Sequence, residues 1–271
     1  MQLKSPPGPL RRRLIAASCA LLSTSAARGQ EVPEGSFVGR LLKEWQLESA
    51  LAYYHENGRV QAIEPVVSAS HDYGDGGNVS LNFTFDSLSG SSPNGALPSR
   101  AVQTFASPSA QSFANPRRLY SIAPGNLPAD SSYSDARAAF GGSWTLPLER
   151  LTRLTLDGKL SIEDDFYSGT FAATIAHDFN DKNTTVSFGL SEEADAIKPV
   201  GNTPVPLSNF VAFAREGNQS KNGVAALLGV TQVMNRYWLA ELNITADRFS
   251  GYLNDPYKIV SVLDAGGNTT G

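Results

Sequence analysis

The sequence predicts an all-β fold, an antiparallel up-and-down β-barrel that crosses a membrane with about nine or ten strands. Polar and apolar side chains alternate along much of the chain, which is the period of a β-strand. Most alternating segments can be drawn at nine to twelve residues, whereas strands of soluble proteins average about 5–6. Membrane-spanning strands need about 9–11 residues. Long connections occur only at odd-numbered positions between these segments, a third observation that favours a barrel.

The first 27 residues have the features of a secretory signal peptide. Lys4 and the basic run 11–13 precede a short apolar segment, 14–22, which is too short to span a bilayer. Ser25 and Ala27 are small residues suited to the −3 and −1 positions of a cleavage site. We therefore expect export, with 28–44 forming a periplasmic N-terminal segment and 45–271 forming the barrel.

Charge and cysteine content limit the partners of the exported chain. The whole sequence holds 22 Lys and Arg against 26 Asp and Glu. Four basic residues leave with the signal peptide, so 18 basic residues face 26 acidic ones and the net charge is −8. An acidic protein is a poor ligand for nucleic acid, and we expect no such partner. The single Cys19 lies within the signal peptide, so the exported fold depends on its β-ladders.

The predicted strands follow one another from Trp45 to Asp247. The clearest alternate over 79–86, 154–163 and 238–247, each with one mainly apolar and one polar face. A helix would scatter the same residues around its circumference. In chain order the strands are predicted over 45–55, 60–72, 79–86, 136–147, 154–163, 167–177, 184–192, 223–234 and 238–247, with a possible tenth starting near Tyr257.

The length of a connection depends on whether its number along the chain is even or odd. The second, fourth, sixth and eighth connections are tight, at 74–78, 147–150, 178–183 and 235–236. The very long ones are the third and seventh, at 89–135 and 193–222, whereas the first and fifth are short. Outer-membrane barrels have short periplasmic turns and longer extracellular loops. A chain that enters from the periplasm would place its even connections on the periplasmic side.

The two strand faces differ in chemistry as a barrel requires. The apolar faces mix Leu, Ile, Val and Phe with Ala and Gly, which suits contact with lipid. Backbone groups in lipid must all be paired, so alternating strands that span a membrane must close into a barrel. Charged side chains within the polar faces would line a wet lumen. The candidate lumen-facing residues are Asp157, Lys159, Glu163, Glu241 and Asp247.

Several segments resemble a family of Gram-negative outer-membrane proteins known only by a domain of unknown function. They are WQLESALAYYHENGRVQAIEP, DSLSGSSPNGALPS, FNDKNTTVSFGLS, PVGNTPVPL, LLGVTQVMNR and GYLNDPYKIVSVLD, in order along the chain. The resemblance implies an outer-membrane location and a barrel, but no activity. Family members continue through further strands, whereas this sequence ends at Gly271 without a terminal aromatic residue. We therefore expect a C-terminally truncated chain.

No arrangement of residues predicts catalysis, a cofactor or a resident metal. There is no Gly-x-Ser-x-Gly motif, and His55, His71 and His177 fall on separate strand ends. The acidic residues at 163–165, in a loop, and at 192–195, at the top of a neighbouring strand, are expected to be solvated charges. The segment 254–258 (NDPYK) is expected to be a structural turn.

The function expected is therefore non-enzymatic: a pore, a transporter or a structural surface protein of the outer membrane. Its partners would be outer-membrane lipid, the barrel-assembly machinery during insertion, and small solutes in the lumen. The alternative is a secreted, soluble β-sandwich that acts as a binding or adhesion module.

Overall fold

The computed structural model describes residues 44–57, 59–107, 119–199, 202–208 and 215–267. The predicted signal peptide and most of the segment 28–44 lie outside these residues. The strands are β1 (Gln46–Glu56), β2 (Val60–Asp72), β3 (Asn78–Pro93), β4 (Gln103–Ala106), β5 (Leu119–Ile122), β6 (Ala129–Glu149), β7 (Thr152–Ile162), β8 (Phe166–Phe179), β9 (Thr184–Ile197), β10 (Thr203–Pro204), β11 (Arg215–Glu216), β12 (Gln219–Asn235) and β13 (Trp238–Gly251).

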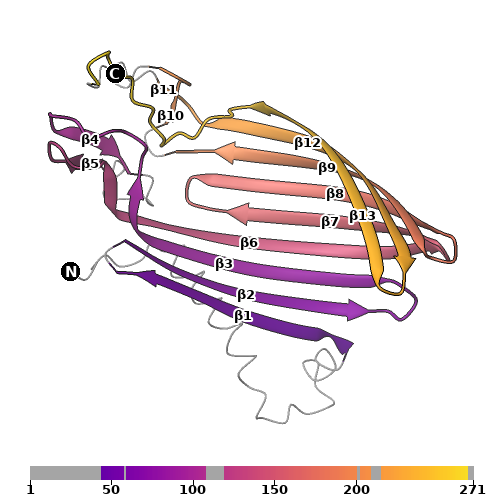
Figure 1. Ribbon diagram of the computed structural model, residues 1–271. Helices are drawn as coiled ribbons and strands as arrows, with labels where there is room; N and C mark the ends of the chain where they lie inside the picture. The colour runs from indigo at the N-terminus through magenta and orange to yellow at the C-terminus, as the bar shows by residue number, and fades with distance from the viewer. Residues whose placement is uncertain (1–43, 58, 108–118, 200–201, 209–214, 268–271) are drawn as a thin grey trace, which may run out of the picture.

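Nine strands form one curled antiparallel sheet in the order β1-β2-β3-β6-β7-β8-β9-β12-β13 (Figure 1). Each strand pairs with the strand that precedes or follows it in the meander, so all nine predicted strands are present in the predicted order. Several are longer than predicted: β3 has 16 residues, β6 has 21 and β12 has 17. The all-β, antiparallel part of the prediction is confirmed.

The sheet does not close into a barrel within the described residues. Its edges are β1 and β13, and neither pairs with the other. The first and ninth strands of an antiparallel row run in the same direction. Direct closure would therefore create a parallel pair in a sheet that otherwise holds antiparallel pairs only.

The tenth strand expected near Tyr257 is not formed. The chain from Tyr252 to Gly267 makes turns and one isolated bridge at Leu263, without joining the sheet. Asp255 and Pro256 explain why. The Asp255 side chain accepts a hydrogen bond from the Tyr257 amide at 2.8 Å, which fixes a turn, and Pro256 has no amide to give to a ladder.

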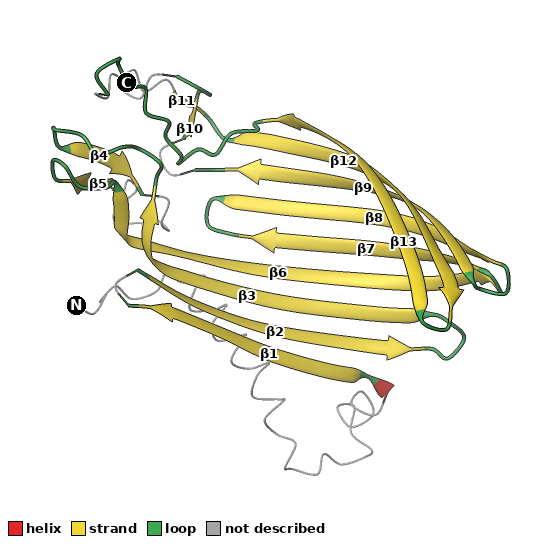
Figure 2. Cartoon of the chain, viewed as in Figure 1, coloured by secondary structure: helices red, strands yellow, loops and turns green. Residues whose placement is uncertain are grey.

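The connections gather at two ends of the sheet according to their parity (Figure 2). The end with tight turns, at 73–77, 150–151, 180–183 and 236–237, is here called the turn end. The opposite end is called the loop end. It holds the described parts of the connections 57–59, 94–128, 163–165 and 198–218, together with the described segment after β13. The β4–β5 and β10–β11 hairpins belong to its two long connections.

Strand register aligns the apolar side chains into one face that crosses the whole sheet. Phe83 lies opposite Phe140, and Phe140 lies opposite Leu160. Further along the sheet, Leu228 lies opposite Ile244. These side chains are not packed under a second layer: Phe140 is 50% exposed, Leu160 59% and Ile244 57%. The exposed apolar face therefore extends from β1 to β13. Contiguous apolar surface of that extent marks a region that contacts something other than water.

Candidate functional site

A segment that follows β13 crosses the loop end of the sheet. This strap, residues 252–263, leaves β13 at Gly251, whose φ of +99° lies in the left-handed region. A Cβ at Gly251 would lie 2.3 Å from the carbonyl oxygen of Ser220, so only glycine fits this turn. The strap is then fixed by Tyr252, whose amide donates to the Ser220 carbonyl at 2.9 Å. The Tyr252 hydroxyl donates to the Pro204 carbonyl at 3.2 Å.

The far half of the strap docks on the chain that leaves β3. The Ile259 amide donates to the Asn94 carbonyl at 2.9 Å, and the Leu97 amide donates to the Ser261 hydroxyl at 3.1 Å. The Lys258 ammonium donates to the Pro93 carbonyl at 2.9 Å. These contacts join residues about 165 positions apart in the sequence. The segments in contact are parts of DSLSGSSPNGALPS and GYLNDPYKIVSVLD.

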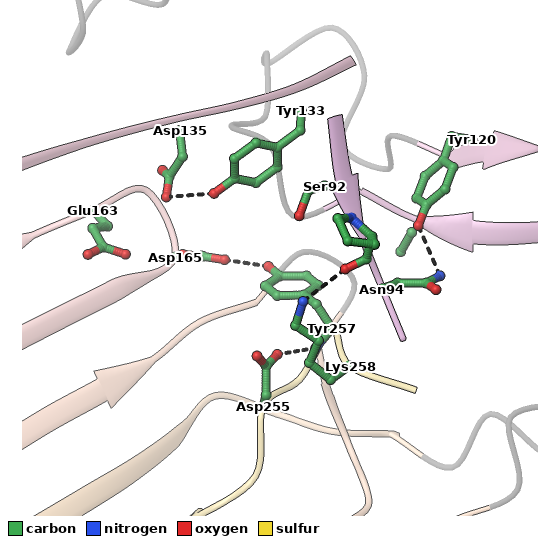
Figure 3. Close-up of a pocket in the computed structure, with 12 residues that line it drawn as sticks. Ser92, Asn94, Tyr120, Tyr133, Asp135, Glu163, Asp165, Asp255, Tyr257 and Lys258 are labelled. Atoms are coloured by element: carbon green, nitrogen blue, oxygen red, sulfur yellow. Dashed lines mark hydrogen bonds between the residues drawn. The ribbon is translucent and has the colours of Figure 1, made fainter. Parts of the chain in front are cut away.

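A cavity of about 260 Å³ lies between the strap and the loop-end connections (Figure 3). Five structural elements contribute to its wall: the end of β3, the β4–β5 hairpin, the start of β6, the β7–β8 turn and the strap. The lining residues are Ser92, Pro93, Asn94, Ala106, Tyr120, Tyr133, Asp135, Glu163, Asp165, Asp255, Tyr257 and Lys258.

Three carboxyl groups meet on one side of this cavity. Tyr257 donates a hydrogen bond to Asp165, and Tyr133 donates to Asp135 at 3.4 Å (Figure 3). Burial raises the pKa of Glu163 to about 7, and repulsion from Asp135 and Asp165 adds to the shift. Burial also raises the pKa of Asp165, against the opposing effect of the Tyr257 hydrogen bond. The cavity therefore holds a carboxyl group that changes charge near neutral pH.

The described lining of the cavity does not contain a serine–histidine pair. It has a serine, Ser92, but no histidine that could act as its base. No group of three or more His, Cys, Asp or Glu side chains in the described part of the chain could hold a metal ion. Within the same residues, no helix is both long and apolar enough to pass through a bilayer.

The five candidate lumen-facing residues fall into two groups. Asp157 and Lys159 lie within β7, and Glu241 and Asp247 within β13, all on the face opposite the exposed apolar face. Glu163 lies one residue beyond the end of β7, at the loop end, where it faces the cavity. The structure brings Glu163 together with Asp135 and Asp165 but not with the other four. That these side chains line a lumen stays a prediction.

The three histidines do not converge. His55 lies near the loop end of β1, whereas His71 and His177 lie near the turn end of β2 and β8. His71 stacks on Trp45 with ring centroids 5.6 Å apart, and His177 contacts the Thr152 hydroxyl at 2.8 Å. His55 stacks on Tyr53 with ring centroids 6.4 Å apart.

Several residues of the site carried no signal in the sequence. Asp135 and Tyr133 belong to β6, but they fall in a stretch predicted as part of a long loop. The acidic run 192–195, expected at the top of a strand, lies inside β9, which is longer than predicted. Two of its members pair with Lys221: Glu193 at 3.2 Å and Asp195 at 2.8 Å. The 254–258 segment does form a turn, and the same residues also dock on Pro93 and Asp165.

Comparison with known proteins gives one assignment. No curated protein and no solved structure is significantly similar to the chain. A family model does match, over residues 11–271, and its description is Protein of unknown function (DUF3570). This match covers the strap, the cavity and all nine strands of the main sheet. The chain therefore belongs to the DUF3570 family of proteins of unknown function.

Proposed function

We propose that this chain forms a membrane-embedded β-barrel structure of the outer membrane, with a non-enzymatic role in solute passage or surface architecture. The observation that carries the proposal is the exposed apolar face that crosses all nine strands. In water the exposure of such a face would be unfavourable, whereas a surface that contacts lipid tails must be apolar.

Strand dimensions support the same proposal. The shortest of the nine strands, β1 and β7, have 11 residues. At about 3.3 Å per residue, such a strand is about 36 Å long, enough for a tilted strand to cross an apolar band of about 25 Å. The sorting of connections into a turn end and a loop end is also typical of outer-membrane barrels.

The polar face supports a water-filled interior. It carries Asp157 and Lys159 in β7, and the ion pair between Arg137 and Asp86 at 2.5 Å joins β6 to β3. Charges within a strand need water or a partner charge. We propose that this face lines the lumen, and that the charged residues influence which solutes pass.

The alternative, a soluble β-sandwich, requires a second sheet over the apolar face. In the described residues the small β4–β5 and β10–β11 hairpins lie at the loop end, and the apolar side chains remain about half exposed. The membrane proposal accounts for this exposure without a second sheet, because lipid would cover the apolar side chains.

Membrane extraction tests the proposal directly. Cells that express the full-length protein would be lysed and their membranes washed with high salt and then with alkaline carbonate. We expect the protein to stay in the outer-membrane fraction and to shift in apparent mass on boiling before gel electrophoresis. Release by carbonate into the soluble fraction would contradict the proposal and favour the sandwich.

A further inference from the structure

The strap is an element that the sheet does not need for its own pairing. It takes part in none of the sheet's ladders, yet it crosses the end where every long connection gathers. We propose that the strap is a releasable cover, which obstructs the loop end of the lumen when docked and admits small hydrophilic solutes when it detaches. This inference rests on the proposed membrane barrel and extends it to control of passage.

The path of the strap fits a cover. The strap begins at the end of β13. Its Tyr252 contacts Pro204 in the β9–β12 connection, and its Tyr257 contacts Asp165 in the β7–β8 turn. It ends on the chain that leaves the third strand, at Asn94. The strap thus connects distant parts of a curled sheet.

The polar face of the sheet lies beneath the strap. Strand alternation places Tyr133 and Asp135 of β6 on the same face as Arg137, Ser143 and the other polar residues of that strand. Both line the cavity beneath the strap. The strap is therefore on the side of the proposed lumen, where its position decides whether the loop end is open.

The attachment of the strap is polar and shallow. Tyr252, where the strap begins, is only 7% exposed, but beyond it Leu253 is 59% exposed and Val260 80%. Hydrogen bonds at Lys258, Ile259 and Ser261 hold it to the chain after β3. Segments with little buried apolar surface open at low free-energy cost compared with the strands of a sheet.

The docking position is nonetheless specific. Gly95, where the strap lands, has a φ of +90°, and a Cβ there would lie 2.9 Å from the Ile259 carbonyl oxygen. Glycine is therefore required both where the strap departs, at Gly251, and where it docks. A segment that lay on the surface without a defined position would not need glycine at either place.

A reversible disulfide lock tests the cover. The double variant Leu97→Cys/Ser261→Cys places thiols at a contact where the Leu97 amide and the Ser261 hydroxyl are 3.1 Å apart. The only natural cysteine, Cys19, lies in the predicted signal peptide. The matched control, Ala226→Cys/Ala246→Cys, links paired residues of β12 and β13 without touching the strap. The full-length variants would be reconstituted in liposomes, and the uptake of a small neutral sugar measured with and without reductant.

We expect uptake through the Leu97→Cys/Ser261→Cys variant to fall several-fold on oxidation and to recover with reductant, whereas the control does not change. Tyr257→Phe, which removes the hydroxyl that binds Asp165, should raise uptake. Boiling shifts on gels would show that each variant is folded.

Equal uptake in the oxidised and reduced lock would overturn the inference. The absence of uptake in every state of every folded variant would also overturn it, because a barrel that solutes do not cross has no opening for the strap to obstruct. In that second case carbonate-resistant insertion would still support the membrane barrel, so the two proposals fail by different measurements.

Discussion

Tyr257 and Asp165 are 92 residues apart in the sequence and are joined by a hydrogen bond at the loop end. The bond links the strap to the β7–β8 turn, and it closes one wall of the cavity that contains Glu163 and Asp135. The bond therefore holds the strap next to Glu163, whose pKa is raised by burial to about 7.

The first prediction concerns pH. The folded state raises the pKa of Glu163 from the ordinary 4.5 to about 7. A carboxyl that holds its proton more tightly when folded contributes stability at low pH, and this contribution is lost as the pH rises through about 7. We expect amides of the strap to exchange hydrogen more slowly at about pH 5.5 than at about pH 8, after correction for intrinsic rates.

Glu163→Gln is the matched variant for this effect. It keeps the shape of the side chain without the charge, so the corrected pH dependence should shrink. Glu149→Gln, at the turn end of β6, should leave it unchanged. A pH dependence that persists in full in Glu163→Gln would show that another group controls the strap.

The second prediction concerns the landing site of the strap. Gly95→Ala forces an alanine into a left-handed conformation, at a cost of about 1–2 kcal/mol, and adds a Cβ 2.9 Å from the Ile259 carbonyl oxygen. Gly125→Ala is a close control, because Gly125 has a φ of +79° but no atom within 4 Å of the place where the added methyl group would lie. We expect faster proteolysis of the strap in Gly95→Ala and little change in Gly125→Ala. Equal proteolysis would mean that the contact with Ile259 does not hold the strap.

Strand alternation is a local property, which explains why the sheet could be predicted from the sequence. Leu154, Leu156 and Leu160 share a face because the period of a strand is two, whatever lies beside them. The ends of the strands were harder to predict from the sequence. Residues 129–135 extend β6 because they pair with the similarly extended end of β3, from Leu88 to Pro93, and that partner is absent from a local pattern.

The strap could be predicted from the sequence only in part. Its turn was predictable, since Asp255 and Pro256 are turn residues with known local behaviour. Its docking on Pro93 and Asn94 depends on the curl of a nine-stranded sheet, which brings residues about 165 positions apart together. The same applies to Glu163, whose surroundings include Asp135 from a different strand. Local alternation placed Glu163 on the polar face but gave no indication of its neighbours.

The third prediction concerns an ion pair on the polar face. The Lys221 ammonium lies 2.8 Å from Asp195, whose side chain is fully buried, and 3.2 Å from Glu193. Removing one member of a buried pair leaves an uncompensated charge, so Lys221→Met should destabilise the fold by about 3 kcal/mol. The double variant Lys221→Met/Asp195→Asn should recover a large part of that loss. Urea unfolding of the protein in lipid vesicles measures both, and a double variant no more stable than the single one would contradict the pairing.

The last prediction distinguishes lipid from water at the exposed apolar face. Phe171 and Thr170 are neighbours in β8 whose side chains point to opposite faces, and Phe171 is 58% exposed. If the apolar face contacts lipid, Phe171→Arg should cost about 2–4 kcal/mol and reduce the folded, boiling-sensitive fraction in vesicles. Thr170→Arg, on the polar face between Lys159 and Glu193, should be tolerated. A soluble sheet whose apolar face met water would tolerate an arginine at position 171, because a half-exposed surface substitution usually changes stability by only about 0.5 kcal/mol. The folded fraction of Phe171→Arg relative to that of Thr170→Arg therefore distinguishes a membrane barrel from a sheet whose apolar face meets solvent.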